Sequence, residues 1–197
     1  MQKYNHTQDL FSNLPETVLL VGNGKMQSRG ELIDSYDFVI RFNDFEVDGH
    51  TSDVGTKISA ISVHCSDFSF PHTKVLEKNY IKYRDSSYIF TTSPKFGNSK
   101  SDILHSDNET QLLSVFKPIQ SNPNIRLSSG MSLILNLSLF FNKNVHLIGF
   151  DFMETGHYWD PNFSNEQFWK NMGKNTPEHN SNYERNIISK INTIKLL

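Results

Sequence analysis

The most constraining feature of this chain is a set of short apolar runs that are almost continuous rather than alternating. They are rich in β-branched and aromatic residues, and they read TVLLVG (17–22), YDFVIRF (36–42), KISAISVHC (57–65), SYIFTT (87–92) and VHLIGFDF (145–152). Strands of this composition are typical of a parallel sheet that is buried on both faces. The sequence therefore predicts a mostly parallel sheet.

Helical spacing separates some of these runs. In the segment 131–141, MSLILNLSLFF, apolar residues recur at Leu133, Ile134, Leu137 and Phe141, which is the pattern of a helix with one buried face. A last helix is predicted to begin near Asn180 and to include YERNIISKINTIKLL, whereas 96–110 and 160–180 are polar and loop-like. The expected fold class is α/β, with a mostly parallel sheet flanked by helices in one Rossmann-like domain.

Length, charge and cysteine content narrow the functional classes. We expect residues 1–197 to form a single domain, with about residues 1–16 as a flexible amino-terminal segment. A net charge of -2 gives no electrostatic reason to expect a nucleic-acid partner, and no apolar stretch is long enough to span a membrane. Since Cys65 is the only cysteine, the chain suits a reducing compartment, and a cytoplasmic location is expected.

Polar residues follow two of the predicted strands. Gly22, Asn23 and Gly24 come directly after the first strand, and Asn43 ends the next. In open α/β sheets the ligand crevice lies beyond the carboxyl ends of the strands, where glycines let backbone N–H groups approach a ligand. Both asparagine amides are therefore candidates for binding a nucleotide, although asparagine after a strand is also a common turn former.

A second candidate site precedes the clearest helix. Ser128, Ser129 and Gly130 come immediately before the segment 131–141, so their hydroxyl and N–H groups are candidates for holding an anion, with Arg126 adding charge. The alternative interpretation is a simple helix cap. A dinucleotide fingerprint G-x-G-x-x-G is not met, because Gln27 occupies the last glycine position.

Two histidines in the carboxyl-terminal part are candidates for proton transfer. His157 lies in GHYWD and His179 in EHNSNYE, and histidine titrates close to neutral pH. No metal site is predicted, since the alternating carboxylates of DFEVD (44–48) are more typical of a solvated edge and no histidine pair has ligand spacing.

Taken together, these segments resemble the sialyltransferase motifs in their order. The segment 21–57 resembles the large sialyl motif through Gly22-Asn23, Arg41-x-Asn43 and Asp53-Val54-Gly55. The segment 127–152 resembles the small motif, HYWD (157–160) the third, and His179 with Glu184 the very small motif H-x4-E. The sequence is similar to the eukaryotic-type sialyltransferase family, and RLSSG and GFDF also resemble related bacterial sialyltransferases.

This resemblance implies a GT-A-like variant of the α/β fold and an inverting, metal-independent glycosyltransferase that needs no cofactor. The implied donor is a CMP-activated sialic acid, and the implied acceptor is a glycan or glycolipid, through which the protein would associate with a membrane. The motifs imply that His179 is the general base, that Glu184 supports its loop, and that His157 stabilises the leaving phosphate with help from Tyr158. The implied substrate-binding residues are Gly22, Asn23, Asn43, Arg126, Ser128, Ser129, Gly130, Gly149 and Tyr158.

Two alternatives stay open from the sequence. In the first alternative, the chain is a transferase whose donor is another CMP-linked ulosonic acid, such as Kdo. In the second, the chain is a non-catalytic nucleotide-binding domain. The chain also departs from the eukaryotic-type enzymes, because Cys65 alone cannot form the disulfide between the large and small motifs, and no anchor or stem is recognisable. Residues between Cys65 and Arg126, where acceptor recognition is expected, resemble no motif of the family.

Overall fold

The computed structural model describes residues 11–63, 79, 82, 88–91, 103–105, 127–152, 154–160, 162–164, 166–167, 170 and 180–197. Within these residues, seven strands form one sheet in the order β5-β4-β3-β2-β1-β6-β7, and every neighbouring pair is parallel. The strands are β1 (Thr17–Val21), β2 (Val39–Phe42), β3 (Ala60–Val63), β4 (Tyr88–Thr91), β5 (Ile103–His105), β6 (Asn144–Ile148) and β7 (Ile194–Leu196). All five predicted strands are therefore confirmed.

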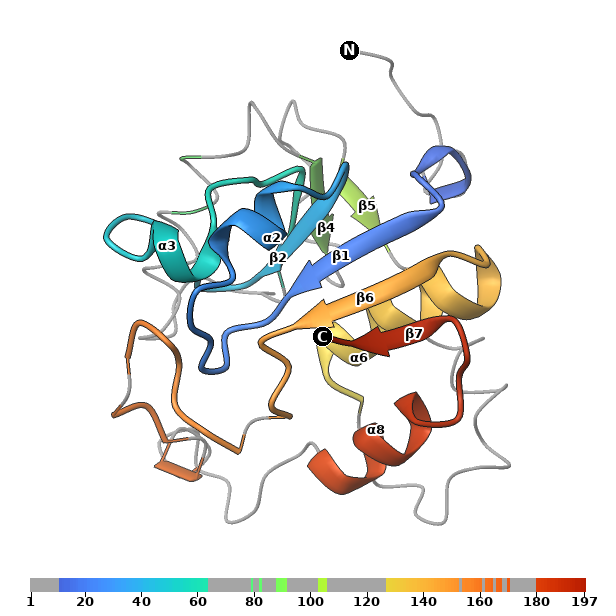
Figure 1. The fold of residues 1–197 in the computed structure, drawn as a ribbon. Coiled ribbons are helices and arrows are strands. Elements are labelled where there is room, and N and C mark those ends of the chain that lie inside the picture. Colours follow the sequence, from blue (N-terminus) through green and yellow to red (C-terminus); the bar gives the residue numbers. More distant parts are fainter. Residues whose placement is uncertain are drawn as a thin grey trace.

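The strand order changes direction beside β1. From β1 the sheet extends through β2 to β5 on one side, whereas β6 and then β7 lie on the other side. Figure 1 shows β1 and β6 side by side, with their carboxyl ends at the same edge. Crevices at such a topological switch point are where open α/β sheets bind ligands. The switch point between β1 and β6 is thus the first place to look for a site.

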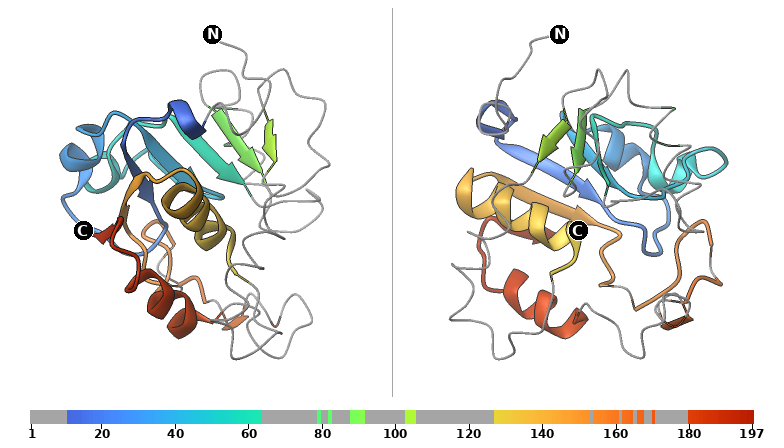
Figure 2. Two further views of the ribbon diagram at one scale, coloured as in Figure 1. Left: turned by 90° about the vertical axis from the view of Figure 1, so that its right-hand side faces the viewer. Right: turned by 180° about the vertical axis from the view of Figure 1, so that it is seen from behind.

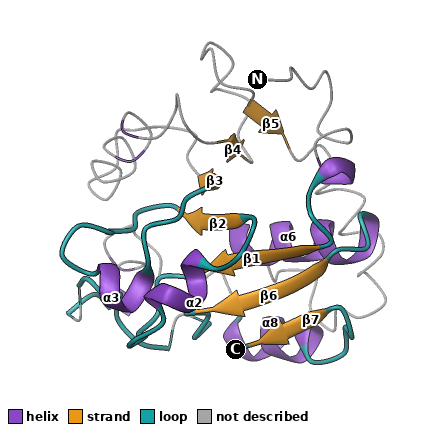
Figure 3. Ribbon diagram, turned by 45° about the horizontal axis from the view of Figure 1, so that its top comes forward, coloured by secondary structure: helices purple, strands orange, loops and turns teal. Residues whose placement is uncertain are grey.

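Helices cover both faces of the sheet (Figures 2 and 3). On one face lie α2 (Gly30–Asp34) and, beside it, α3 (Thr51–Val54). On the other face lie α6 (Ser129–Leu135), its π-helical continuation η2 (Asn136–Phe140), and α8 (Ser181–Ile188). This three-layer arrangement confirms the predicted α/β architecture.

Alternation along β1 explains why the strand sequence is continuously apolar. Val18 and Leu20 pack into the core cluster that contains residues of α6 and α8, whereas Leu19 and Val21 pack into the cluster that contains Ile33 of α2. Each of these four strand residues is at most 2% exposed. Residues 18–21 are buried on both faces of the sheet and gain hydrophobic stabilisation at every position, which explains why all four are apolar.

The predicted central helix is confirmed as α6 followed by η2. Ser128 is its N-cap, and its Oγ accepts a hydrogen bond from the Met131 amide at 3.1 Å. This is the usual way in which a serine satisfies one of the free N–H groups at a helix start. The cap interpretation of Ser128 is therefore confirmed.

Two expectations about secondary structure are wrong. The last helix ends at Ile188 instead of continuing to the end of the chain, and residues 194–196 form strand β7 beside β6. The predicted loop 96–110 contains strand β5. Both strands have only three residues, so neither shows enough of a periodic pattern to be distinguished from its surroundings.

Candidate functional site

Two glycine turns meet at the switch point between β1 and β6. The Gly22 amide donates to the Ile148 carbonyl at 2.8 Å, and the Gly24 amide donates to the Gly149 carbonyl at 2.9 Å. A Cβ atom on Gly22 would overlap the Gly149 carbonyl oxygen, and Gly149 has a φ of +69°. These turns therefore require glycine, which lets the two backbones approach each other closely.

Asn23 joins the ends of β1 and β2. Its Nδ2 donates to the carbonyls of Phe42 at 3.1 Å and Asp44 at 2.8 Å, which are the two residues that flank Asn43. Asn43 itself has a φ of +50°, and its amide donates to the Ser62 carbonyl at 2.8 Å. The structure thus brings the two predicted asparagines together at the carboxyl edge of the sheet.

The amide oxygen of Asn23 is left for another partner. Its Oδ1 is buried and has no hydrogen-bond partner among the described residues. Leaving a buried acceptor unpaired costs about 1–3 kcal/mol. A ligand that donates a hydrogen bond at this point would remove that cost.

The segment that contains HYWD is held against these turns by Tyr158. The Tyr158 amide donates to the Asn23 carbonyl at 2.9 Å. The Tyr158 hydroxyl donates to the Glu46 carbonyl and accepts from the Glu46 amide, the latter at 2.9 Å. Tyr158 therefore connects its loop to both β1 and β2, and its hydroxyl is engaged by Glu46.

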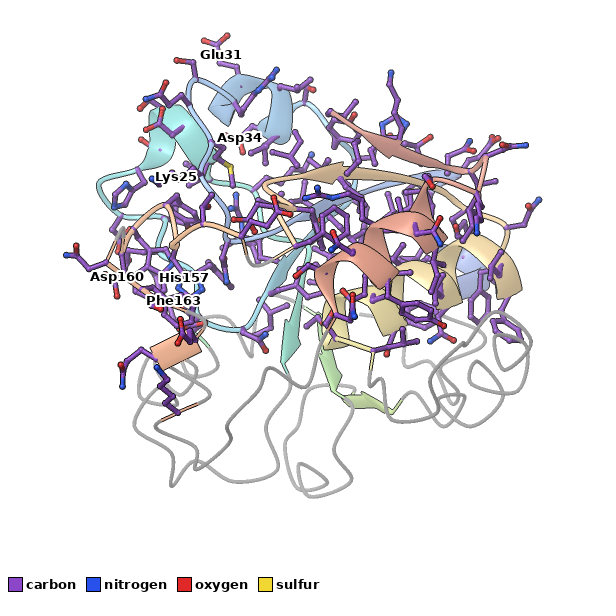
Figure 4. All side chains as sticks on the ribbon, turned by 90° about the horizontal axis from the view of Figure 1, so that it is seen from below. Lys25, Glu31, Asp34, His157, Asp160 and Phe163 are labelled. Carbon is purple, nitrogen blue, oxygen red and sulfur yellow. The ribbon has the colours of Figure 1, made fainter. Side chains whose placement is uncertain are left out.

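His157 lies in an aromatic environment within the same loop. Its ring stacks on Phe163 at a centroid distance of 4.0 Å and an interplanar angle of 11°, and its centroid is 4.8 Å from that of Trp159. Figure 4 shows His157, Asp160 and Phe163 close together. Burial lowers the pKa of His157, and the carboxylates of Asp160 and Asp151 oppose this effect. Burial therefore favours the uncharged form of the His157 imidazole.

The start of α6 is connected to α8 by Glu184. The Ser128 amide donates to Glu184 Oε1 at 2.6 Å, and the Ser128 Oγ donates to Oε2 at 2.9 Å. Glu184 is only 3% exposed, and burial raises its pKa although the two hydrogen bonds from Ser128 oppose this. The predicted small and very small motifs are thus in direct contact, and the polar groups of Ser128 serve the chain itself.

Of the remaining predicted site residues, two lie in the described part of the structure and two lie outside it. Gly130 lies in the first turn of α6, where an added Cβ would be 3.3 Å from a ring carbon of Phe150. Ser129 begins the same helix. Arg126 and His179 lie outside the described residues.

Asp44 is a site residue that the sequence interpretation missed. Burial raises the pKa of Asp44 to about 7, and the Asp160 carboxylate adds to this effect, while a hydrogen bond to its own backbone opposes it. The expectation of a solvated edge is right for Asp48, which is exposed and pairs with Lys82 at 2.9 Å, but wrong for Asp44. Only the sequence position next to Asn43 could have indicated a special role.

The described residues form neither a metal site nor a membrane-spanning helix. No group of three or more His, Cys, Asp or Glu side chains in the described part of the chain is arranged to hold a metal ion. None of the described helices has the length and apolar character needed to cross a membrane.

Comparison with protein families gives a match in the amino-terminal half. Residues 12–101 match the model of glycosyltransferase family 29 (sialyltransferase). The match includes the turns after β1 and β2, with Gly22, Asn23 and Asn43, and it ends before α6. The predicted resemblance to sialyltransferases is therefore confirmed for these residues. A comparison of the sequence with curated proteins finds no match.

Solved structures share the fold over most of the chain. A mammalian sialyltransferase in complex with Gal-β-1-3GalNAc-ortho-nitrophenol is 23% identical, with a TM-score of 0.54, covering 92% of this chain and 68% of the other. A Campylobacter jejuni sialyltransferase in complex with cytidine-5'-monophosphate is 19% identical, with a TM-score of 0.55, covering 91% of this chain and 78% of the other.

An α-2,3-sialyltransferase from the same bacterium, in its apo form, is 20% identical, with a TM-score of 0.54, covering 92% of this chain and 75% of the other. The predicted GT-A-like fold of sialyltransferases is thus confirmed. The solved structures share the fold of this chain, and the family match is to a glycosyltransferase family over residues 12–101.

Proposed function

We propose that this protein is an inverting sialyltransferase that moves sialic acid from a CMP-activated donor to a hydroxyl group of a glycan or glycolipid. One observation carries this proposal: Asn23, which follows β1 within the segment that matches the sialyltransferase family, has a buried Oδ1 with no hydrogen-bond partner among the described residues. The neighbours crystallised with a disaccharide and with cytidine monophosphate support the same substrate classes. We propose that residues 1–197 act as one domain at the cytoplasmic side of a membrane.

The donor is proposed to bind along the carboxyl edge of β1, β2 and β6. The amides of Gly22 and Gly24 donate to the Ile148 and Gly149 carbonyls, so the phosphate is proposed to lie beside this turn and not on these two N–H groups. Asn23 Oδ1 is directed to a hydroxyl or amino group, because it can only accept. Asn43 is assigned to the ribose or phosphate, and Gly149 to the cytidine. Ser129 and Gly130 are assigned to the sugar carboxylate at the start of α6, and Arg126 adds charge there.

The reaction is proposed to need two proton-handling groups and no metal ion. His179 accepts the proton of the acceptor hydroxyl as its oxygen forms a bond to the anomeric carbon on the face opposite CMP. The bond from that carbon to the phosphate oxygen breaks with inversion, and His157 contacts the departing phosphate. A single phosphate needs less charge compensation than a diphosphate, and the sequence contains no Asp-x-Asp pair of the kind that binds a metal.

The experiment that tests this proposal measures CMP release from two donors, CMP-sialic acid and CMP-Kdo, with a mixture of glycan acceptors and with EDTA present. We expect release from CMP-sialic acid that resists the chelator and falls about 10²- to 10⁴-fold in His179→Ala. His146→Gln is the matched control, because His146 lies in β6, contacts Tyr36 and has no assigned role in the reaction. Release from CMP-Kdo alone would show that the donor sugar is Kdo and not sialic acid. Release from neither donor would contradict the proposed function.

A further inference from the structure

Besides Asn23 Oδ1, two polar atoms of the HYWD segment (157–160) are buried without a hydrogen-bond partner among the described residues. They are His157 Nδ1 and Trp159 Nε1. The main chain between these two residues is fixed, because Tyr158 is hydrogen-bonded to Asn23 and to Glu46. The two rings are therefore held next to the switch point, and the missing bonds do not result from an unanchored loop.

The chemistry of these atoms is complementary to a ligand rather than to each other. An indole N–H can only donate a hydrogen bond, and an amide oxygen can only accept one. Trp159 Nε1 and Asn23 Oδ1 would satisfy each other if they were within reach, but both are unpartnered. A molecule with both hydroxyl donors and oxygen acceptors, such as a nucleotide sugar, is able to pair with both groups at once.

The carboxylates beside His157 are already used within the loop. Asp151 accepts hydrogen bonds from the amide of Thr155 at 2.8 Å and from its hydroxyl, and Asp160 accepts one from the Asn162 amide at 3.2 Å. These bonds shape the turns before and after the HYWD segment. The indole N–H, in contrast, stabilises no turn of the loop, so a ligand remains as its partner.

We propose that Trp159 is a donor-binding residue, whose Nε1–H donates a hydrogen bond to an oxygen of the CMP-sugar. This inference rests on the proposed function, since it takes the CMP-sugar as the ligand. The oxygen belongs either to the phosphate or to the transferred sugar. Both are strong acceptors, and an uncharged indole N–H binds either without adding charge.

Calorimetric titration with three ligands tests the inference and locates the oxygen. The ligands are cytidine, CMP and a non-hydrolysable CMP-sialic acid analogue, and the variant is Trp159→Phe, which keeps an aromatic ring beside His157 but lacks the N–H. We expect about tenfold weaker binding in the variant, first seen with CMP if the phosphate is the acceptor, or only with the CMP-sugar if the sugar is. Tyr36→Phe is the matched control, because it removes the hydroxyl that contacts His146 elsewhere in the fold.

A measurement on the unmodified protein keeps the test independent of how well the variant folds. The chain has two tryptophans, Trp159 and Trp169, so two indole N–H signals are expected in a ¹⁵N–¹H spectrum, and Trp159→Phe assigns them. On saturation with the CMP-sugar analogue, the Trp159 signal should move downfield and exchange more slowly with water. An unmoved signal together with equal affinities of wild type and variant for all three ligands would overturn the inference. Wild-type protein that binds none of the ligands would overturn the proposed function instead.

Discussion

Two polar clusters differ in what their polar groups bind: one lies within the large-motif segment, and the other also includes residues near Gly149 and in HYWD. In the Arg41 cluster, which consists of Arg41, Asp34 and the backbone of 54–57, Nε and Nη2 of Arg41 and the carboxylate of Asp34 bind the chain itself. Arg41 is 1% exposed and donates from Nη2 to the Val54 carbonyl at 2.6 Å and from Nε to the Lys57 carbonyl at 3.1 Å. Asp34 accepts from the amides of Thr56 and Lys57 at 2.8 and 2.7 Å.

The switch-point site, which consists of Asn23, His157, Trp159 and the turns around Gly22 and Gly149, contrasts with that cluster. Three of its polar atoms are buried and have no partner within the described residues. Asp34 also lies apart from His157 and Asp160 in Figure 4. The hydrogen bonds that Arg41 donates therefore complete the fold, whereas the three atoms of the switch-point site are the ones that we propose to pair with a ligand.

The largest expected effect is the loss of Arg41. Arg41→Met keeps the aliphatic part of the side chain but leaves two buried carbonyls without their donor and Asp34 without a nearby positive charge. We expect the free energy of unfolding to fall by about 3–5 kcal/mol in urea denaturation. Arg29→Met is the control, since Arg29 is exposed. A loss below about 1 kcal/mol would show that the Arg41 cluster does not hold the fold.

The second effect concerns the glycine turns. Gly22→Ala places a Cβ against the Gly149 carbonyl, so we expect about 1–3 kcal/mol of destabilisation and clearly weaker CMP binding. Gly49→Ala is the matched control, because Gly49 has a φ of +84° but nothing lies within 4 Å of its Cβ position. It should cost about 1 kcal/mol through backbone strain and leave CMP affinity unchanged. Equal CMP affinities of Gly22→Ala and Gly49→Ala would show that the glycine turns are not part of the ligand site.

A third comparison uses the pH dependence of stability. Burial alone would raise the pKa of Asp34, but the hydrogen bonds from Lys57 and Thr56 outweigh it and lower the pKa below 3.8. Asp34 therefore stabilises the fold at pH values above 3.8, and this contribution is lost as the pH falls through the folded pKa. Asp34→Asn should be less stable than wild type at neutral pH and lose that difference in acid.

Asp44 should behave in the opposite way. Because its pKa rises from 3.8 to about 7, the folded protein keeps a proton that the unfolded chain releases, so this contribution to stability declines as the pH rises from 3.8 to about 7. Urea denaturation at several pH values should show that Asp44→Asn removes this decline, since His157 and Glu184 titrate in both proteins. Parallel pH profiles of wild type and Asp44→Asn would contradict the assigned burial of Asp44.

The smallest expected effect is that of Tyr158→Phe. The variant loses both hydrogen bonds to Glu46 but keeps the backbone bond to Asn23, so stability should fall by only about 0.5–1.5 kcal/mol. CMP binding should weaken as well, because the loop that carries His157 and Trp159 is less firmly held. If affinity is the same as in the control Tyr36→Phe, the loop does not contribute to the ligand site.

Much of the framework could be predicted from the sequence. Five strands follow from their continuous apolar runs, and the helix after Ser128 follows from its spacing and its N-cap. The switch point could not be predicted, because nothing in the local sequence shows that β6 pairs with β1 or that the last three-residue strand extends the sheet. The positions of Gly22 and Asn43 after their strands nevertheless indicated that both residues lie at the carboxyl edge of the sheet, as the structure shows.

The roles of individual polar residues were harder to predict, because hydrogen-bond partners far along the chain decide them. The sequence indicates an anion-binding role for Ser128. In the structure, however, Glu184, 56 positions later, accepts hydrogen bonds from the Ser128 amide and hydroxyl. The motif indicates that Tyr158 contacts the phosphate, whereas in the structure its hydroxyl accepts a hydrogen bond from the Glu46 amide. Asp44 reads as a surface residue until burial and Asp160 are seen to raise its pKa. The proposed base, His179, rests on the motif alone.

The most direct test of the central claim is a crystal structure of the protein with a non-hydrolysable CMP-sialic acid analogue. We expect the nucleotide at the carboxyl ends of β1 and β6, with its phosphate near the Gly22–Gly24 turn and a hydrogen bond donated to Asn23 Oδ1. We also expect an oxygen of the ligand within hydrogen-bond distance of Trp159 Nε1. A nucleotide bound elsewhere on the protein, with Asn23 Oδ1 still unpartnered, would show that the switch-point site is not the donor site.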